Sequence, residues 1–221
     1  MCRNASWCSE LDEDPKNWSK VCPLLPPSHF SDSLTYFINA YQMAIETRIK
    51  DAIKTLKKIP SDEMREWFEE HGSYSGHKHR VNLLGRPLPD KYEGKLETRK
   101  QFSITEQRKI FMRDAYLCRY CGVRVIDEKI LKRMETMVGR DHFKSSGNSN
   151  ADRHGIVFFF RATVDHVLPL SYGGQTTFDN GVTSCWNCNY GKYNALLEQM
   201  DIIDPRELTL DKELGWNGLL F

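Results

Sequence analysis

Long apolar runs are missing from this sequence of 221 residues. No run approaches the roughly 20 apolar residues of a membrane-spanning helix. The start, MCRNASWCSELDEDP, is acidic and lacks the basic and then apolar order of a signal peptide. A large excess of one charge is missing too, since the net charge is only +1. This near-neutral balance argues against a protein that coats nucleic acid non-specifically. We therefore expect a cytosolic (cytoplasmic) protein, or a nucleoid-associated one if its ligand is DNA.

The composition is ordinary for a globular protein, with 40% apolar and 28% charged residues. A chain of this length can bury a substantial core, as one domain or as one domain with a smaller lobe. Its charge is unevenly spread: residues 91–133 hold twelve Lys and Arg against six Asp and Glu, whereas residues 196–221 hold two against six. A basic segment suits a polyanionic substrate, although a solvated face gives the same pattern.

The first 30 residues contain four prolines and two tryptophans without a helical period, which is typical of an arm that docks through its aromatic residues. Cys2, Cys8 and Cys22 in this arm invite a second metal site, with His29 as a fourth ligand. Their spacing fits no common ligand pattern, so buried or idle thiols are the better interpretation.

Two helices are predicted after the arm. Apolar residues recur at three- and four-residue steps from Ser31 to about Lys58, which predicts one long helix. Ser61 opens a shorter helix that stops at Gly72, and the two helices are expected to form a hairpin that carries no chemistry.

The next segment, residues 72–102, is rich in turn residues. His77 and His79 alternate as ligands on a strand would, but no acidic or sulfur partner is near, which favours exposed histidines. Arg80 and Arg86 are candidates for phosphate contacts.

A capping box, Ser103 to Glu106, predicts the start of a basic helix that runs into the sequence CRYCG at residues 118–122. A spacer follows, with a short helix expected at residues 127–138 and a flexible stretch at 139–155. The five apolar residues 156–160 predict a buried strand. We interpret residues 127–158 as an insertion, with His142 and His154 at its surface.

Four of the seven cysteines form two C-x-x-C pairs. Cys118, Cys121, Cys185 and Cys188 supply the four thiolates of a structural zinc site, because 63 intervening residues do not matter to a site assembled in space. Such a zinc has no open position, so its role is in folding and not in hydrolysis. Two redox pairs are the alternative, but the strand-to-helix context of such motifs is missing.

Two polar side chains that could act in catalysis, a carboxylate and an imidazole, lie between the two C-x-x-C pairs. Asp165, at the end of a β-rich run, offers a hard carboxylate that suits Mg²⁺ or Mn²⁺. His166 can accept a proton from water near neutral pH. Adjacent strand residues point to opposite faces, so both can flank one phosphate only if the strand ends in a twist or bulge.

The second pair predicts where one further polar residue points. If a helix begins there, consecutive residues diverge by about 100°. Cys188 can then face the zinc while Asn189 faces the hairpin, so that zinc fixes the position of Asn189. Lys192 lies on nearly the same face and could meet a phosphate.

Together these residues resemble the HNH nuclease family, whose ββα-metal fold carries zinc knuckles. The resemblance rests on RKIFMRDAYLCRYCG (108–122), VDHVLPLSYGGQTTFDN (164–180) and CWNCNYGK (185–192). It does not cover the first hundred residues or the spacer.

The resemblance implies a role for each matching residue. Asp165 and Asn189 would bind a catalytic Mg²⁺ or Mn²⁺, with Asn189 in place of the commoner histidine. His166 would be the general base, and Asn180 would hold the hairpin loop that orients it. Products would carry a 5′-phosphate and a 3′-hydroxyl. The expected nucleic-acid contacts are Lys192, Arg113 and Arg119.

The expected fold class is α+β, with a ββα-metal core, one structural zinc per chain and a mainly helical N-terminal region. The expected units are residues 1–102, a nuclease domain at 103–200, and a tail at 201–221. The leading hypothesis is a DNA endonuclease of the restriction or phage-defence kind. A non-catalytic zinc module that binds nucleic acid or protein, and a nuclease subunit activated by a partner protein, are the alternatives. Symmetric double-strand cutting would indicate a homodimer.

Two substitutions are expected to distinguish the role of the catalytic ion from that of the structural zinc. Asp165→Ala should abolish cleavage and leave melting nearly unchanged, because it removes only the catalytic ion. Cys188→Ser should lower stability, because structural zinc contributes to folding directly. An amide oxygen at Asn189 is harder than an imidazole, so Mg²⁺ and Mn²⁺ should support activity better than Ni²⁺ or Co²⁺.

Overall fold

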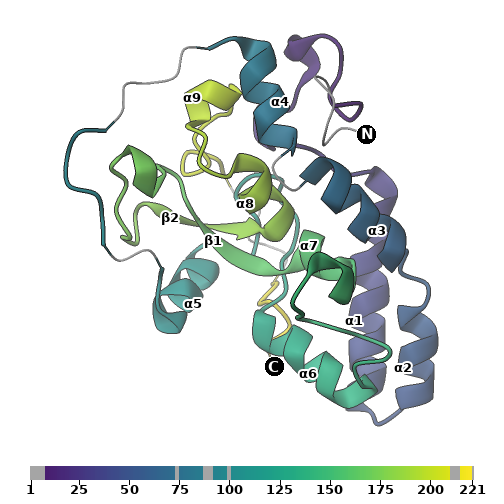
Figure 1. Ribbon diagram of the computed structural model, residues 1–221. Helices are drawn as coiled ribbons and strands as arrows, with labels where there is room; N and C mark the ends of the chain where they lie inside the picture. Colours follow the sequence, from purple (N-terminus) through teal and green to yellow (C-terminus); the bar gives the residue numbers. More distant parts are fainter. Residues whose placement is uncertain (1–7, 73–74, 87–91, 99–100, 210–214, 221) are drawn as a thin grey trace.

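A two-stranded antiparallel hairpin and the helix that follows it form the centre of the chain (Figure 1). The structure, a computed structural model, describes residues 8–72, 75–86, 92–98, 101–209 and 215–220. Strand β1 (Ala162–His166) pairs with β2 (Gly181–Cys185), with Ala162 opposite Cys185 and His166 opposite Gly181. Helix α8 (Trp186–Lys192) begins directly after β2 and packs against both strands. The expected α+β class and the ββα arrangement are confirmed.

Helix α5 (Ile104–Arg113) packs against the same two strands. It begins with the predicted capping box: Glu106 N donates to Ser103 Oγ over 3.3 Å, and Ser103 N donates to Glu106 Oε2 over 2.9 Å. In Figure 1, α5 lies below the hairpin and α8 above it. The hairpin is therefore supported by helices from two distant parts of the sequence.

The remaining elements are mostly helical, and the helices between residues 32 and 67 cover the right-hand side of the view in Figure 1. The α-helices are α1 (Asp32–Ile45), α2 (Ile49–Leu56), α3 (Ser61–Trp67), α4 (Ser75–Leu84), α6 (Glu128–Val138), α7 (Ile156–Phe160) and α9 (Leu197–Met200). Single turns are η2 (Pro15–Asn17), η3 (Ser28–Ser31), the π-helical η4 (Phe68–Gly72), η5 (Asn150–Asp152) and η6 (Leu170–Tyr172). None of the helices in the described ranges is both long and apolar enough to cross a membrane.

The single long helix predicted from Ser31 to Lys58 is wrong, because the chain reverses between α1 and α2. Thr47 has a φ of +62°, its N–H donates to Ala44 O, and Arg48 N donates to Met43 O. These two bonds make a Schellman motif, which ends a helix with a left-handed residue. The apolar period continues through the break and hides it. The helical hairpin consists of α1 and α2, which pack side by side (Figure 1).

Two further expectations about local structure differ from the fold. Residues 156–160, predicted as a strand, form helix α7, and all five side chains are buried. A short run that is apolar on every side has no period to distinguish strand from helix. In the segment expected to be rich in turns, residues 75–84 form α4, so His77 and His79 lie on a helix; their side chains are outside the described part.

The spacer packs on the N-terminal helices. The short helix expected at residues 127–138 is α6, with Asp127 as its N-cap, and α6 and α7 share one hydrophobic core with α1, α2 and α3. We call this the helical core. His142 is exposed, as expected, but His154 is not: its ring packs on Phe143, with centroids 4.8 Å apart. Burial lowers the pKa of His154 to about 4.

The N-terminal arm docks beside α8 and α9 through a buried arginine. Arg80, expected to touch phosphate, is 1% exposed, and it donates hydrogen bonds to the carbonyls of Ser19, Cys22, Pro23 and Met200. Its guanidinium lies 5.4 Å from the ring centroid of Trp18. Arg86 also bonds within the protein, to Glu198 O and to Asp201. Both arginines therefore hold chain segments together.

Candidate active site and zinc centre

The four knuckle cysteines meet beneath the hairpin. The sulfurs of Cys118, Cys121, Cys185 and Cys188 all lie within 4.8 Å of one another, and those of Cys121 and Cys185 are 3.8 Å apart. Two sulfurs on one tetrahedral zinc are also about 3.8 Å apart, because each Zn–S bond is about 2.3 Å long. The cluster is therefore consistent with the predicted structural zinc.

The protonation of these thiols also fits a metal. Hydrogen bonds with neighbouring thiols, that of Cys118 first, lower the pKa of Cys121 to about 5. The same kind of contact raises the pKa values of Cys185 and Cys188. Four buried sulfurs this close share protons among themselves, and a thiophilic cation such as zinc takes the place of those protons.

Asp165 is buried, and one of its carboxylate oxygens is fully engaged. Its Oδ2 accepts a hydrogen bond from Tyr120 Oη at 2.5 Å and lies 3.2 Å from Lys192 Nζ. Burial first, and then the charge of Asp165, raise the pKa of Tyr120 well above its usual range, so the phenol remains a proton donor. Oδ1 has no hydrogen-bond partner among the described residues.

Asn189 presents a second oxygen. Its Nδ2 donates to Thr163 Oγ1 at 3.1 Å and to Val164 O at 3.2 Å, so the amide nitrogen is held by β1. Within the described part of the chain, Oδ1 of Asn189 has no hydrogen-bond partner either. Asn189 is the residue after Cys188, and α8 therefore carries both a zinc-cluster thiol and this amide.

A pocket of about 250 Å³ brings three of the predicted site residues together, Asp165, His166 and Asn189, whereas Asn180 does not line it. It is lined by Val164, Asp165, His166, Pro169, Leu170, Asn189, Tyr190, Tyr193 and Asn194. Although Asp165 and His166 are neighbours on β1, both line this pocket, because His166 is the last residue of the strand. An anionic carboxylate oxygen and a neutral amide oxygen suit a hard divalent cation such as Mg²⁺ or Mn²⁺.

His166 is oriented by two neighbours. Its Nε2 lies 3.1 Å from Thr176 Oγ1, and its ring stacks on Phe102 with centroids 4.8 Å apart. Both contacts come from outside β1, so the ring position depends on the loop after the strand and on the segment before α5.

Asn180 fastens the loop between the strands. Its Oδ1 accepts from Leu168 N at 2.8 Å, and its Nδ2 donates to Leu168 O at 3.0 Å and to Gln175 O at 2.8 Å. Gly174 lies under the same segment, where an added Cβ would come within 1.9 Å of Leu168 O. The loop therefore requires glycine at that position, and it also requires the amide of Asn180.

Lys192, expected to meet a phosphate, is completely buried. Its ammonium donates to His166 O at 2.9 Å and pairs with Asp165. The geometry argues against a DNA contact, because no part of this side chain is exposed. It favours a role in holding the end of β1.

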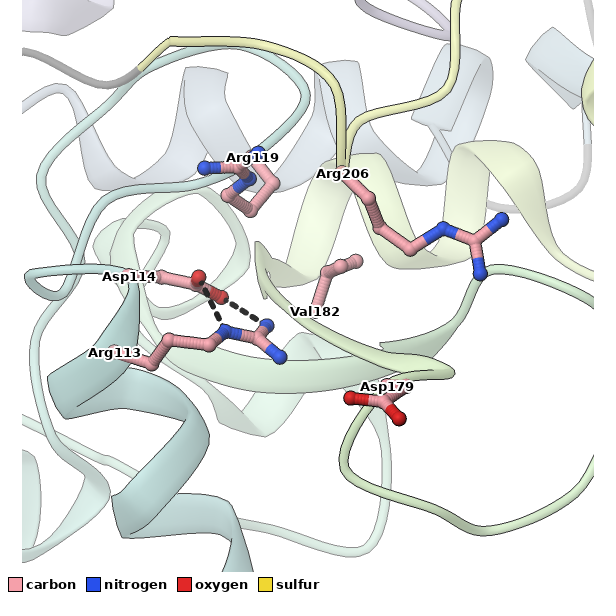
Figure 2. Close-up of a pocket in the computed structure, with 6 residues that line it drawn as sticks. All are labelled: Arg113, Asp114, Arg119, Asp179, Val182 and Arg206. Carbon is pink, nitrogen blue, oxygen red and sulfur yellow. Dashed lines mark hydrogen bonds and ion pairs between the residues drawn. The ribbon is translucent and has the colours of Figure 1, made fainter.

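Arg113 and Arg119, the other expected nucleic-acid contacts, line a different pocket of about 330 Å³ (Figure 2). Arg113 makes a bidentate pair with the buried Asp114 at 2.8 Å and donates to the carbonyls of Phe178 and Gly181. Arg119 donates to the carbonyls of residues 205 and 208. Both guanidinium groups therefore tie chain segments together, and neither lines the pocket of Asp165 and His166.

The sequence did not point to Tyr120 or Thr176, and it gave no sign that Cys22 lies beside the four knuckle cysteines. Tyr120 lies inside the first C-x-x-C pair, Thr176 inside the hairpin loop, and Cys22 in the arm. No motif marks any of them, because each acts through a contact between residues far apart in the chain.

Comparison with known proteins supports one family. Residues 155–195 match the family model described as HNH endonuclease. No curated protein and no solved structure matches the chain. The match covers β1, the loop, β2 and α8, and it confirms the resemblance drawn from the motifs. A domain of this family implies an enzyme that hydrolyses phosphodiester bonds of DNA.

Proposed function

Because the chain contains an HNH endonuclease domain, we propose that it is a metal-dependent nuclease that cleaves DNA in the pocket of Asp165, His166 and Asn189. One observation carries the proposal. Two oxygens without hydrogen-bond partners among the described residues, Asp165 Oδ1 and Asn189 Oδ1, belong to side chains that line the same pocket as the histidine. A module that only binds nucleic acid has no need of this combination.

Asp165 and Asn189 would hold the divalent ion through these oxygens. The ion, when bound, supplies positive charge that stabilises the phosphate and the leaving oxygen. The protein contributes the fixed direction of both ligands. Tyr120 and Lys192 hold the carboxylate from its other oxygen, while β1 holds the amide of Asn189 through its nitrogen.

His166 would take the proton from the attacking water. When Nε2 carries the ring proton and donates it to Thr176 Oγ1, Nδ1 has the lone pair that a base needs. Asn180 does not take part in the proton transfer itself and acts through the position of the loop. Its three hydrogen bonds hold the loop that carries Thr176, and so fix the direction of the ring.

A plasmid assay with purified protein tests the nuclease activity. Wild-type protein and His166→Ala are incubated with supercoiled, linear and single-stranded DNA in Mg²⁺ or Mn²⁺. We expect cleavage by the wild type and its loss in the variant. Intact DNA in every wild-type reaction would favour the binding module. If a defence phenotype still depends on His166 in cells, a partner-activated subunit replaces the autonomous enzyme.

The metals can be assigned separately. We propose one structural zinc per chain at the four cysteines and Mg²⁺ or Mn²⁺ at Asp165 and Asn189. Zinc content is measured by elemental analysis, and the catalytic ion is tested by adding metals to protein depleted of weakly bound ions. Greatest activity with Ni²⁺ would contradict Asn189 as a ligand, because the amide oxygen favours harder cations.

We further propose a role in restriction or phage defence. Support comes from the large helical body outside residues 155–195, which offers surface for recognition beyond the cleavage site. Phage plating on cells that express wild type or His166→Ala would test it, and equal plaque counts would contradict it. Light scattering, with and without DNA, would show whether the enzyme acts as a homodimer.

A further inference from the structure

A fifth cysteine lies against the zinc centre. Cys22 of the N-terminal arm is fully buried, and its sulfur is 3.6 Å from that of Cys188. Its thiol also forms a hydrogen bond with the thiol of Cys121. Cys22 is buried, as one of the two expected interpretations has it, but it is not idle, because its thiol contacts knuckle cysteines 99 or more positions away in the sequence.

The separation between these sulfurs is that of two ligands on one metal. Sulfurs on a tetrahedral zinc are about 3.8 Å apart, and the 3.6 Å between Cys22 and Cys188 is close to this value. Among the knuckle cysteines, Cys22 interacts with Cys188, Cys121 and, electrostatically, Cys118, and its thiol also donates to Leu24 O at 3.3 Å. We therefore place Cys22 beside the face made by those three sulfurs.

The arm holds Cys22 in this position. Cys22 N donates to Ser19 Oγ at 2.9 Å, and Cys22 O accepts from the buried guanidinium of Arg80 at 3.0 Å. Arg80 spans the arm and the residue that ends α9, Met200. The sulfur is therefore fixed from both sides of its own residue, as the ligands of a metal site usually are.

We propose that Cys22 is a fifth thiol of the zinc centre, able to replace Cys185 as the fourth ligand. Cys118, Cys121 and Cys188 are common to both ligand sets. In the exchange, the Cys22 thiol gives its proton to water and its sulfur binds zinc, while the released Cys185 thiolate takes up a proton. The zinc stays divalent and no oxidant is needed. The arm thereby becomes part of the metal centre.

Zinc content of cysteine variants of the full chain tests the exchange. Cys185→Ser should keep about one zinc per chain, since Cys22 completes the set, whereas Cys185→Ser combined with Cys22→Ser should lose it. Cys185→Ser combined with Cys8→Ser is the matched control, because Cys8 is a second buried thiol of the arm and contacts His71. Loss of zinc from Cys185→Ser alone, or equal retention in both double variants, would overturn the proposal.

A second measurement decides the matter if those variants do not fold. Cys22→Ser leaves all four knuckle cysteines intact and should lower the affinity for zinc by about tenfold, as loss of a supporting group typically does. A chromogenic chelator measures it by competition, with Cys8→Ser as the control. Cobalt-loaded protein should also show altered thiolate-to-metal absorption in Cys22→Ser. Unchanged zinc affinity together with an unchanged cobalt spectrum would overturn the proposal.

Discussion

Tyr120 connects the four-cysteine cluster with the pocket of Asp165 through one side chain. It lies between the zinc-cluster residues Cys118 and Cys121, and its hydroxyl donates to the carboxylate of Asp165. Because its pKa is raised well above the usual range, the hydroxyl keeps its proton throughout any workable assay pH. The zinc knuckle therefore positions Asp165 directly, in addition to its effect on α8 through Cys188.

Tyr120→Phe should weaken binding of the catalytic ion. The substitution keeps the ring and removes the hydrogen bond that orients the carboxylate, so we expect the Mn²⁺ concentration for half-maximal cleavage to rise by about tenfold or more. Tyr116→Phe is the matched control, since its hydroxyl faces Asp127. An equal change in both variants would remove Tyr120 from this role.

Asp165→Ala should lower stability as well as activity. We expected unchanged melting from the sequence, but Asp165 is the carboxylate partner of the fully buried Lys192. Removing this carboxylate leaves the buried ammonium of Lys192 without its ion-pair partner, which should lower the free energy of unfolding by about 3–5 kcal/mol. Chemical unfolding of Asp165→Ala and of the doubly substituted Asp165→Ala with Lys192→Met measures this. The second substitution should restore much of the lost stability, and failure to do so would contradict the pairing.

At the scale of elements, the chain breaks between α1 and α2 at a residue with a left-handed backbone conformation, which the sequence does not predict. Thr47 occupies the position after the helix where glycine is commonest. A β-branched side chain is strained there, because its Cβ approaches the backbone. The tertiary packing of the two helices compensates for this strain.

Thr47→Gly should therefore stabilise the protein. We expect the free energy of unfolding to rise by about 0.5–1 kcal/mol, since the relief of strain exceeds the extra entropy of glycine in the unfolded chain. Denaturant titration measures it, and DNA cleavage should not change. Thr136→Gly, within α6, is the opposite control and should destabilise. A loss of stability in Thr47→Gly would show that the turn is not strained.

Prediction from sequence succeeded where the signal is local. The capping box at Ser103 gave the correct start of one helix, and the short helix expected at residues 127–138 is present as α6. The four cysteines and Asp165, His166, Asn180 and Asn189 carry recognisable spacing, and the structure brings the lining residues into one pocket. It failed where distant segments meet. No sequence motif marks Cys22 or Tyr120. The charged groups of Lys192 and Arg113 make hydrogen bonds within the protein to residues that are distant in the sequence.

At the scale of the whole molecule, the helical core extends from the arm to α8 without interruption. Phe68 stacks on Phe158 at 4.5 Å, and Phe158 contacts Trp186, the first residue of α8, at 5.5 Å. The loop before α7 is tied into the same core by His154, which must stay neutral to remain buried.

Stability should fall as the pH is lowered from about 6.5 to 4. The folded pKa of His154, about 4, lies below its usual value of 6.5, so the unfolded chain binds a proton first as the pH falls. His71 has a pKa lowered by burial and acts in the same direction. Chemical unfolding at several pH values should show a flatter pH dependence for His154→Gln. The exposed His142→Gln is the control, and identical curves for wild type and His154→Gln would contradict the assignment.

The aromatic stack across α7 also limits how far this chain can be shortened. A fragment cut to residues 155–195 would keep the hairpin, α8 and the second cysteine pair, but it would lose Phe68 and the helices that cover Phe158 and Phe159. It would also lose Cys118, Cys121 and Tyr120. Such a minimal fragment would expose the aromatic side chains of α7 and keep only two of the four knuckle cysteines, and we expect it to aggregate. For protein engineering, the smallest transplantable unit is therefore close to the entire chain.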